Sequence, residues 1–426
     1  MFEVEQIEKR IRMVQYVVMI CIVSIMCGQM PVVYAEEITE NELYAKAAVL
    51  MDAESGRVLY GKNATTPMAM ASTTKIMTLL VTLENAELEE VTTVSAYAAS
   101  MPNVQLHIRE GEQYYLKDLV YSLMLESHND SAVAIAEAVG GSVEEFAKMM
   151  NEKAKEIGCT DTCFITPNGL DATAQYEQED GTVVTKEHTT TATDLAKIMS
   201  YCITKSEHKD TFLAITQTPS HSFTDVSGKR QFSCTNHNAF LSMMSGALSG
   251  KTGFTGKAGY CYVGALERDG KIYVVSLLAC GWPNNKNYKW SDTRKLMEYG
   301  IENFQKQYFS QVSIPQDAVE GVVVTDAKTD ELGQEKILQV EMANDVSEEE
   351  SVLLKQDETI TIRVERVRQL EAPVDAGTVI GKLTYLVENQ EWKCVDLVVK
   401  EGAESIDYAW CIRQVIKRWS IRKMGM

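Results

Sequence analysis

The sequence predicts an α/β domain over residues 40–308, a small all-β domain over residues 309–402 and an amphipathic tail over residues 403–426. Strand-like runs stand at both ends of the first segment, and helical patterns lie between them. After about Val312 the chain turns to short runs that alternate apolar and polar residues, which is typical of half-buried strands. The tail combines apolar residues at helical spacing with several basic residues.

The first domain begins with two strand-like runs joined at Glu54-Ser-Gly56, a pattern typical of a hairpin. The runs are Ala47–Ala53 and Arg57–Tyr60. Helical patterns follow at Thr74–Glu84, Leu116–Leu125, Asp130–Val139 and Val143–Ile157, and Gly140-Gly141 and Gly158 mark the ends of the last two. Strands return near Phe232, at Ala258–Glu267 and at Ile272–Ala279, and a final helix is predicted over Ser291–Tyr308. This order favours an antiparallel sheet packed against a helical subdomain.

The second domain is predicted from runs of period two separated by turn residues such as Pro373-Val-Asp-Ala-Gly377. The runs are Val322–Val324, Ile337–Met342, Thr359–Val367 and Lys393–Val399. The acidic stretch Ser347–Glu350 is interpreted as a solvated loop. No catalytic cluster is visible in this domain.

Composition excludes two classes of protein. A hydrophobic fraction of 45% with 24% charged residues indicates an ordered globular chain rather than a disordered one. A net charge of −19 repels phosphates, so nucleic acid is not an expected partner.

The N-terminus predicts export. Lys9, Arg10 and Arg12 precede the apolar run Met13–Met26, and Val33-Tyr-Ala35 offers small residues for cleavage. Residues 1–35 are therefore interpreted as a signal peptide that is cleaved after Ala35. An uncleaved membrane anchor is the alternative, although the run is short for a span of about 20 residues.

The chain contains ten cysteines, of which Cys21 and Cys27 fall in the signal segment. In an exported protein the others invite disulfides, and Cys159 and Cys163 are the one close pair. We interpret most of them as buried thiols and keep a Cys159–Cys163 bridge as a hypothesis. Because neither a C-x-x-C pair nor a histidine cluster is present, we expect no metal and no cofactor.

Ser72 and Lys75 are the candidate reactive pair. They lie three residues apart at the start of a helical run, so their side chains can meet on one face. The surrounding residues are apolar, and burial favours the uncharged amine, which can accept a proton from the serine hydroxyl. A helix cap with a surface lysine is the alternative, because S-x-x-K alone is a weak signal.

Two later triplets strengthen the catalytic interpretation. Ser127-His-Asn129 lies between two apolar stretches, and Lys251-Thr-Gly253 precedes a strand-like run. S-x-x-K followed by S-D-N and K-T-G is the ordered motif set of penicillin-binding proteins and class A β-lactamases. The middle triplet departs from this set, with Ser-His-Asn for Ser-Asp-Asn, but it keeps the outer serine and asparagine. Each triplet alone is also compatible with a cap or a turn, whereas the ordered set is specific.

On these motifs the chain resembles the D-alanyl-D-alanine carboxypeptidases among the low-molecular-mass penicillin-binding proteins (S11-like serine peptidases). Further stretches of the catalytic region carry the same resemblance: Ala48–Tyr60, Pro67–Lys75, Thr166–Asp171, Thr191–Ala196 and Lys251–Cys261. The resemblance implies an α/β serine-transferase fold of the β-lactamase and penicillin-binding-protein type. It also implies peptidoglycan stem peptides as substrates, β-lactams as covalent inhibitors and a site at the outer face of the bacterial cytoplasmic membrane.

The resemblance further implies a role for each motif residue. Ser72 is expected to form the acyl-enzyme, Lys75 to act as its base and Ser127 to pass a proton to the leaving amine. Asn129 is expected to bind the substrate amide. The strand residues Lys251, Thr252, Gly253 and Phe254 are expected to bind the substrate carboxylate and backbone and to complete the oxyanion hole.

The histidines near these motifs are not expected to be catalytic. The family keeps the position of His128 for a non-catalytic residue, which disfavours a Ser–His triad. His188 is interpreted as structural or adjacent to the substrate. His237 stands between two asparagines where the family carries a basic residue, which leaves the charge at that position dependent on pH.

Rival interpretations remain. A class A β-lactamase shares the triplets, but no Glu-x-x-Leu-Asn segment lies between Asn129 and Lys251. A wall- or β-lactam-sensing module that is acylated without turnover is a second alternative. Transpeptidase or endopeptidase activity of the same site is a third.

The tail predicts a helix that lies on an anionic membrane surface. On a helix one face carries Tyr408, Cys411, Ile412, Val415, Ile416 and Trp419. Positive charge comes from Arg413, Lys417, Arg418, Arg422 and Lys423. Tryptophan on a basic amphipathic helix favours binding at the membrane interface. A helix that packs on its own β domain is the alternative.

Overall fold

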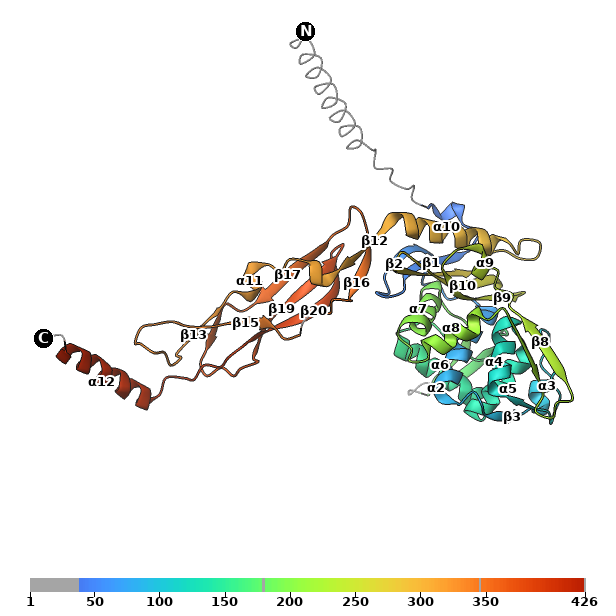
Figure 1. Ribbon diagram of the computed structural model, residues 1–426, viewed down its shortest axis with the longest axis horizontal. Helices are drawn as coiled ribbons and strands as arrows, with labels where there is room; N and C mark the ends of the chain where they lie inside the picture. Colours follow the sequence, from blue (N-terminus) through green and yellow to red (C-terminus); the bar gives the residue numbers. More distant parts are fainter. Residues whose placement is uncertain (1–37, 178–180, 345, 425–426) are drawn as a thin grey trace, which may run out of the picture. The chain divides into compact units, whose positions relative to one another are not determined.

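The computed structural model describes residues 38–177, 181–344 and 346–424, with side chains to residue 419 (Figure 1). The predicted signal peptide, with its cleavage after Ala35, lies outside these residues. Within the described part of the chain, no helix is both long and apolar enough to cross a membrane.

An antiparallel sheet of five strands forms the frame of the first domain, in the order β2-β1-β11-β10-β9. The strands are β1 (Ala47–Asp52), β2 (Val58–Lys62), β9 (Ala247–Thr255), β10 (Gly259–Arg268) and β11 (Lys271–Leu278). Strands from the two ends of the domain pair directly, with Leu50 opposite Val275. The predicted antiparallel sheet is therefore confirmed. Its edge strand β9 carries Lys251–Gly253.

Helices cover both faces of this sheet, with α10 on one face and α7 on the other (Figure 1). The helical elements are η1 (Glu40–Glu42), η2 (Ala71–Thr74), α2 (Lys75–Asn85), α3 (Ala96–Ala99), α4 (Leu116–Leu125), α5 (Asn129–Gly140), α6 (Val143–Ile157), α7 (Ala192–Thr204), α8 (Lys209–Gln217), α9 (Phe240–Met243) and α10 (Tyr288–Asn303). Three two-stranded sheets lie among them: β3 (Val91–Thr93) with β4 (Gln113–Tyr115), β5 (Thr173–Glu177) with β6 (Val183–Glu187), and β7 (Ser220–Thr224) with β8 (Gln231–Thr235).

Helix α2 lies in the core of the helical subdomain. Every side chain from Lys75 to Leu83 is buried, including the lysine itself. A helix that is buried all round has no solvent face, so its polar groups must find partners within the protein.

The predicted helix over Ser291–Tyr308 is partly wrong. Helix α10 begins at Tyr288 and ends at Asn303, and Phe304–Tyr308 forms strand β12, which pairs with β16 (Ser351–Lys355). Burial along β12 alternates from Phe304 onward. This is the period of a strand, which the sequence interpretation merged with the helix before it.

The second domain is all-β apart from short helical turns, as predicted. Its elements are η3 (Phe309–Gln311), α11 (Gln316–Val319), β13 (Val322–Thr325), β14 (Lys336–Leu338), β15 (Val340–Met342), β17 (Ile360–Arg366), β18 (Gln369–Glu371), β19 (Val379–Val387) and β20 (Gln390–Val399). The predicted run Ile337–Met342 divides into β14 and β15, which belong to different sheets. Strands β16 and β19 were not predicted, because each has a stretch of consecutive buried residues and so lacks simple alternation.

The interpretation of most cysteines as buried thiols is confirmed for Cys159, Cys202, Cys234, Cys261 and Cys280, whereas the hypothesis of a Cys159–Cys163 bridge is wrong. All eight cysteines in the described part of the chain are free, including Cys159 and Cys163. Cys159 Sγ is directed to the carbonyl oxygen of Asp194 at 3.5 Å, whereas Cys163 Sγ lies 3.9 Å from the Tyr176 hydroxyl. The two thiols therefore point to different neighbours despite their short spacing.

Candidate active site

Ser72 and Lys75 meet at the junction of η2 and α2. Lys75 Nζ lies 3.0 Å from Ser72 Oγ. Ser72 sits in the 3-10 turn and Lys75 is the first residue of the α-helix. The predicted contact between a serine and a lysine three residues apart is therefore present.

Two oxygens hold the Lys75 amine toward the serine. Lys75 Nζ donates to Asn129 Oδ1 at 2.8 Å and to the carbonyl oxygen of Asn168 at 2.8 Å. Burial lowers the pKa of Lys75 well below its ordinary value, and the nearby Lys251 ammonium lowers it further. An uncharged amine with its lone pair toward a hydroxyl is a competent general base.

The Asn168 carbonyl reaches Lys75 because its loop lies against η2. Gly169 has φ +85°, and a Cβ there would lie 2.0 Å from the carbonyl oxygen of Ala71. Only glycine permits this approach. Thr78 Oγ1 fixes the same loop by donating to the Pro167 carbonyl at 2.6 Å. The Pro-Asn-Gly turn was part of the resemblance, but no role for its carbonyl was predicted.

His188 holds this loop from behind and is not a catalytic base. Its Nδ1 accepts from the backbone N–H groups of Ile165 and Thr166 at 2.9 and 3.3 Å, and its Nε2 lies 2.8 Å from Thr74 Oγ1. Burial lowers the pKa of His188 to about 3, so the ring is neutral and its Nε2–H donates to Thr74. The predicted structural role is confirmed.

Ser127 and Asn129 come from the turn between α4 and α5. Ser127 has φ +69° and, among the described residues, its buried Oγ has no hydrogen-bond partner. Asn129 is fixed at both ends: its backbone N–H donates to the Val104 carbonyl at 2.7 Å, and its Nδ2 donates to the Pro102 carbonyl at 3.1 Å. The strained turn therefore presents a free hydroxyl beside a fixed amide.

Lys251, Thr252 and Gly253 lie on β9, which runs alongside η2. A Cβ on Gly253 would lie 2.9 Å from Ser72 N, so this glycine lets the strand approach the backbone of Ser72. Burial lowers the pKa of Lys251 to about 7, and its Nζ donates to the Thr252 carbonyl at 2.9 Å. Within the described chain, Lys251 has no hydrogen bond to Ser127.

A cleft of about 630 Å³ brings these motif residues together. Ser72, Ser127 and Lys251–Phe254 line it, while Lys75 and Asn129 lie behind its wall. Sequence reasoning missed a second group at its rim: Tyr260, Lys286, Asn287, Lys289 and Trp290. Lys289 Nζ lies 4.9 Å from the Tyr260 ring centre and 4.8 Å from that of Trp290. Tyr260 lies on β10, and the other four residues come from the start of α10 and the polar loop before it, where no sequence motif marks them.

The other two histidines near the motifs take different positions. His237 lines the cleft, as expected from its place between two asparagines. The His128 side chain is buried outside the cleft lining, with Nδ1 2.8 Å from Ser122 Oγ. The Ser–His interpretation is therefore wrong for Ser72, whose nitrogen neighbour is Lys75.

The chain is similar to one enzyme family across most of its length. The family model described as D-alanyl-D-alanine carboxypeptidase matches residues 34–278. A second model, described as the C-terminal domain of penicillin-binding protein 5, matches residues 318–405.

Individual relatives give the same result. D-alanyl-D-alanine carboxypeptidase DacF of Bacillus subtilis is 27% identical over 384 residues, 88% of this chain and 90% of the relative. A D-alanyl-D-alanine carboxypeptidase of Streptomyces sp. K15 is 31% identical over 63% of this chain and 90% of its own length. The crystal structure of penicillin-binding protein 5 from Haemophilus influenzae superposes with a TM-score of 0.64 at 21% identity, covering 87% of this chain and 100% of that one. At this identity the structural match indicates a common fold.

Proposed function

The chain belongs to the D-alanyl-D-alanine carboxypeptidase family of serine peptidases, and on this basis we propose that Ser72 removes the terminal D-alanine from peptidoglycan stem peptides. The observation that carries the proposal is the 3.0 Å contact between Ser72 Oγ and Lys75 Nζ. Lys75 is buried, and its lowered pKa favours the uncharged amine. The expected alternatives of endopeptidase and transpeptidase activity use the same acyl-enzyme and differ in substrate and acceptor.

Acylation begins at the hydroxyl of Ser72. Neutral Lys75 takes the serine proton as Oγ attacks the carbonyl carbon between the two D-alanines. The tetrahedral oxyanion is held by the backbone N–H groups of Ser72 and Phe254, and one such donor is typically worth about 3 kcal/mol. The close approach of Gly253 to Ser72 N supports this pairing of donors.

Collapse of the intermediate requires a proton on the leaving amine. The Ser127 hydroxyl has no other hydrogen-bond partner among the described residues, so it is free to donate to the amine. It then recovers a proton from Lys75, which received one from Ser72. Asn129, already fixed by Pro102 and Val104, orients Lys75 and offers its amide to the substrate.

The substrate carboxylate is bound by Lys251 and Thr252. Lys251 is buried at one wall of the cleft, and a carboxylate beside it would stabilise its ammonium form. Water then attacks the acyl-enzyme and releases the shortened peptide. β-Lactams acylate Ser72 by the same route.

One assay separates the proposal from its rivals. The purified protein is incubated with a peptide that ends in D-Ala-D-Ala, and free D-alanine is measured together with the lifetime of the penicillin adduct. We expect D-alanine release and a long-lived adduct. Rapid hydrolysis of penicillin would favour the β-lactamase, and a stable adduct without D-alanine release would favour the sensing module.

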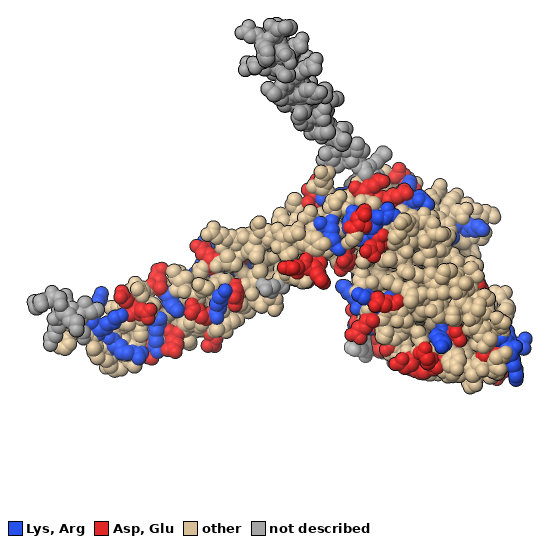
Figure 2. Space-filling view, viewed as in Figure 1, with Lys and Arg blue, Asp and Glu red and all other residues tan. Residues whose placement is uncertain are grey.

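We propose further that the mature enzyme is exported and held at the outer face of the membrane by α12 (Tyr408–Met424). The predicted apolar face is exposed: Tyr408 is 83% accessible, Val415 69% and Trp419 72%. The opposite side is anchored, because Trp410 is buried and its Nε1 donates to the Thr329 carbonyl at 3.0 Å. Figure 2 shows Lys and Arg side chains on this helix.

Vesicle sedimentation tests this location. The protein is expected to bind vesicles that contain anionic lipid and to lose this binding when Val415 and Trp419 are both changed to Ser. D-alanine release from a soluble peptide should stay unchanged in that variant. Equal binding of both proteins to the vesicles would contradict the membrane role of the helix.

A further inference from the structure

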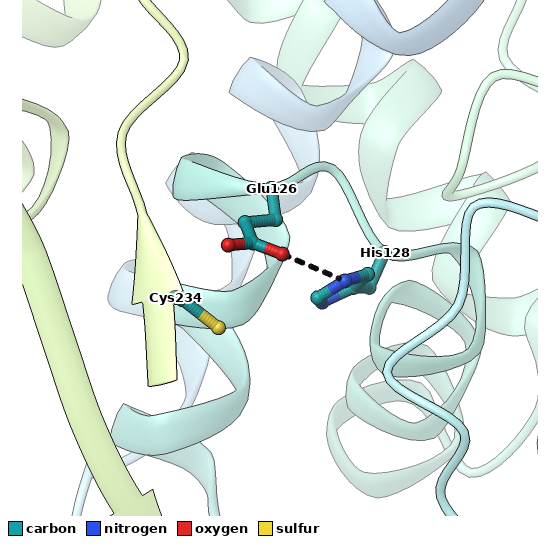
Figure 3. Close-up of side chains that lie close together, drawn as sticks. All are labelled: Glu126, His128 and Cys234. Carbon is teal, nitrogen blue, oxygen red and sulfur yellow. Dashed lines mark ion pairs between the residues drawn. The ribbon is translucent and has the colours of Figure 1, made fainter. Parts of the chain in front are cut away.

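Three potential metal ligands converge beside the Ser127 turn, and one of them, Glu126, also lines the cleft. Glu126 ends α4, His128 precedes α5 and Cys234 comes from β8 (Figure 3). One ligand atom from each side chain lies within 4.8 Å of the other two, and Glu126 Oε2 is 3.4 Å from His128 Nε2. His128 and Cys234 are 4% and 0% exposed. The hydrolytic mechanism uses none of the three.

We propose that Glu126, His128 and Cys234 form a binding site for one zinc-like transition-metal ion. Sulfur, imidazole nitrogen and carboxylate oxygen are the donors that zinc accepts, with water as a fourth ligand, whereas calcium and magnesium prefer oxygen. Tetrahedral zinc with its usual bond lengths separates such donors by about 3.3–3.7 Å. The Glu126–His128 pair already has this spacing, and Cys234 needs a shift on the order of 1 Å.

The surroundings orient two of the ligands. His128 Nδ1 lies 2.8 Å from Ser122 Oγ, so a proton on Nδ1 donates to that hydroxyl and leaves the Nε2 lone pair for a metal. Glu126 Oε1 accepts from the Thr235 N–H at 2.8 Å, which leaves Oε2 facing His128. Partners of this kind fix ligand orientation in metal sites. No sequence pattern predicts the site, because Cys234 approaches Glu126 and His128 only in the folded chain.

Binding requires a proton to leave and an entrance for the ion. A cysteine ligates a metal as the thiolate, so binding releases the thiol proton of Cys234 to solvent. Glu126 lines the catalytic cleft, and its side chain is 26% exposed, which gives the ion a path. The divalent ion balances one thiolate and one carboxylate.

Occupancy also bears on catalysis. His128 stands between Ser127 and Asn129, so contraction around a metal pulls on the turn that carries both. The metal would join this turn to β8, which is already linked to it through Glu126 and Thr235. We expect zinc to slow penicillin labelling of Ser72 and a chelator to restore it. The metal-binding measurements themselves do not depend on the proposed peptidase activity.

The test uses the purified full-length protein, reduced and freed of metal with a chelator. Added Zn²⁺ should bind at one ion per chain, and Co²⁺ should give the near-ultraviolet absorption of a cobalt–thiolate bond. Cys234→Ser and His128→Gln should each weaken binding by at least about tenfold, and Cys234→Ser should abolish the band. The matched control Cys202→Ser changes another cysteine with 0% exposure and should keep both properties.

A milder variant guards against misfolding. Ser122→Ala keeps all three ligands but removes the partner of His128 Nδ1, and it should weaken Zn²⁺ binding about tenfold. Zn²⁺ should raise the melting temperature of the wild type and of Cys202→Ser, but not that of Cys234→Ser. Stoichiometric binding that persists in Cys234→Ser, or a cobalt complex without thiolate absorption, would overturn the site.

Discussion

The two serines of the cleft stand in contrasting surroundings. Ser72 is already paired with its base, since Lys75 Nζ lies 3.0 Å away and two further oxygens hold that amine. Ser127, in a turn with φ +69°, has a buried hydroxyl that no described residue binds. The Ser72 hydroxyl is therefore organised before substrate arrives, whereas the Ser127 hydroxyl has no partner among the described residues until substrate arrives.

In the proposed mechanism the two serines act in different steps, and this difference in their surroundings supports that division. Preorganised groups lower the barrier without reorganisation during the reaction. An unsatisfied buried hydroxyl costs free energy in the empty enzyme, and a substrate amine that satisfies it recovers that cost. The contrast predicts that a substitution which removes the base of Ser72 abolishes acylation, whereas a substitution at Ser127 slows it.

The largest effect should follow from removing the base. Lys75→Ala is expected to reduce the rate of penicillin labelling at Ser72 by about 10⁴-fold, because no other group takes the serine proton. Lys75→Arg keeps a cation that does not lose its proton and should be equally impaired. Labelling of either variant at the wild-type rate, with the fold intact by circular dichroism, would break the contrast.

Removing the second hydroxyl should cost less. Ser127→Ala is expected to lower both kcat and kcat/KM for a D-Ala-D-Ala peptide by about 10³-fold, within the usual range for a general acid. Ser200→Ala is the matched control, because Ser200 is a buried serine of α7 away from the cleft. A kcat that equals the control's would remove Ser127 from proton transfer.

The next test concerns Gly253, where strand β9 passes close to η2. A Cβ in Gly253→Ala would meet Ser72 N at 2.9 Å and Thr73 N at 3.0 Å, so β9 must move away from η2. Such a displacement is expected to reduce kcat/KM about 100-fold. Gly256→Ala is the matched control. Gly256 lies three residues after Gly253, an added Cβ there meets open space, and the variant should retain activity. Equal activity of the two variants would contradict the close approach.

The smallest effect concerns pH. Burial sets the pKa of Lys251 at about 7, so the ammonium is present below this pH and is lost as the pH rises through it. For a peptide with a free carboxylate, kcat/KM should therefore fall above pH 7, by up to about tenfold per unit. A peptide amide, which needs no cation, should lack this decline. Identical profiles for the two peptides would separate Lys251 from carboxylate binding.

Local patterns predicted the chemistry better than the supports around it. The Ser72–Lys75 contact follows from helical spacing alone, and the order of the triplets led to the cleft that Ser127 and Lys251 share. The Asn168 carbonyl reaches Lys75, and His188 binds the backbone of the same loop, only because this loop folds back onto η2. The periodicity of apolar residues in the sequence does not predict that fold. The helix predicted over the residues of β12 was also wrong, because pairing with the partner strand β16 outweighs local propensity there.

The pairing of β12 with β16 also limits how this enzyme can be shortened. Leu353 of β16 donates its N–H to the buried carboxylate of Asp52 at 3.1 Å, and Arg57 pairs with Glu358 at 2.6 Å. A peptidase fragment that stops at Tyr308 would lose these ties and would carry an open strand edge, which is a template for self-association. The first domain produced alone should therefore aggregate, and a soluble preparation should include residues through β20.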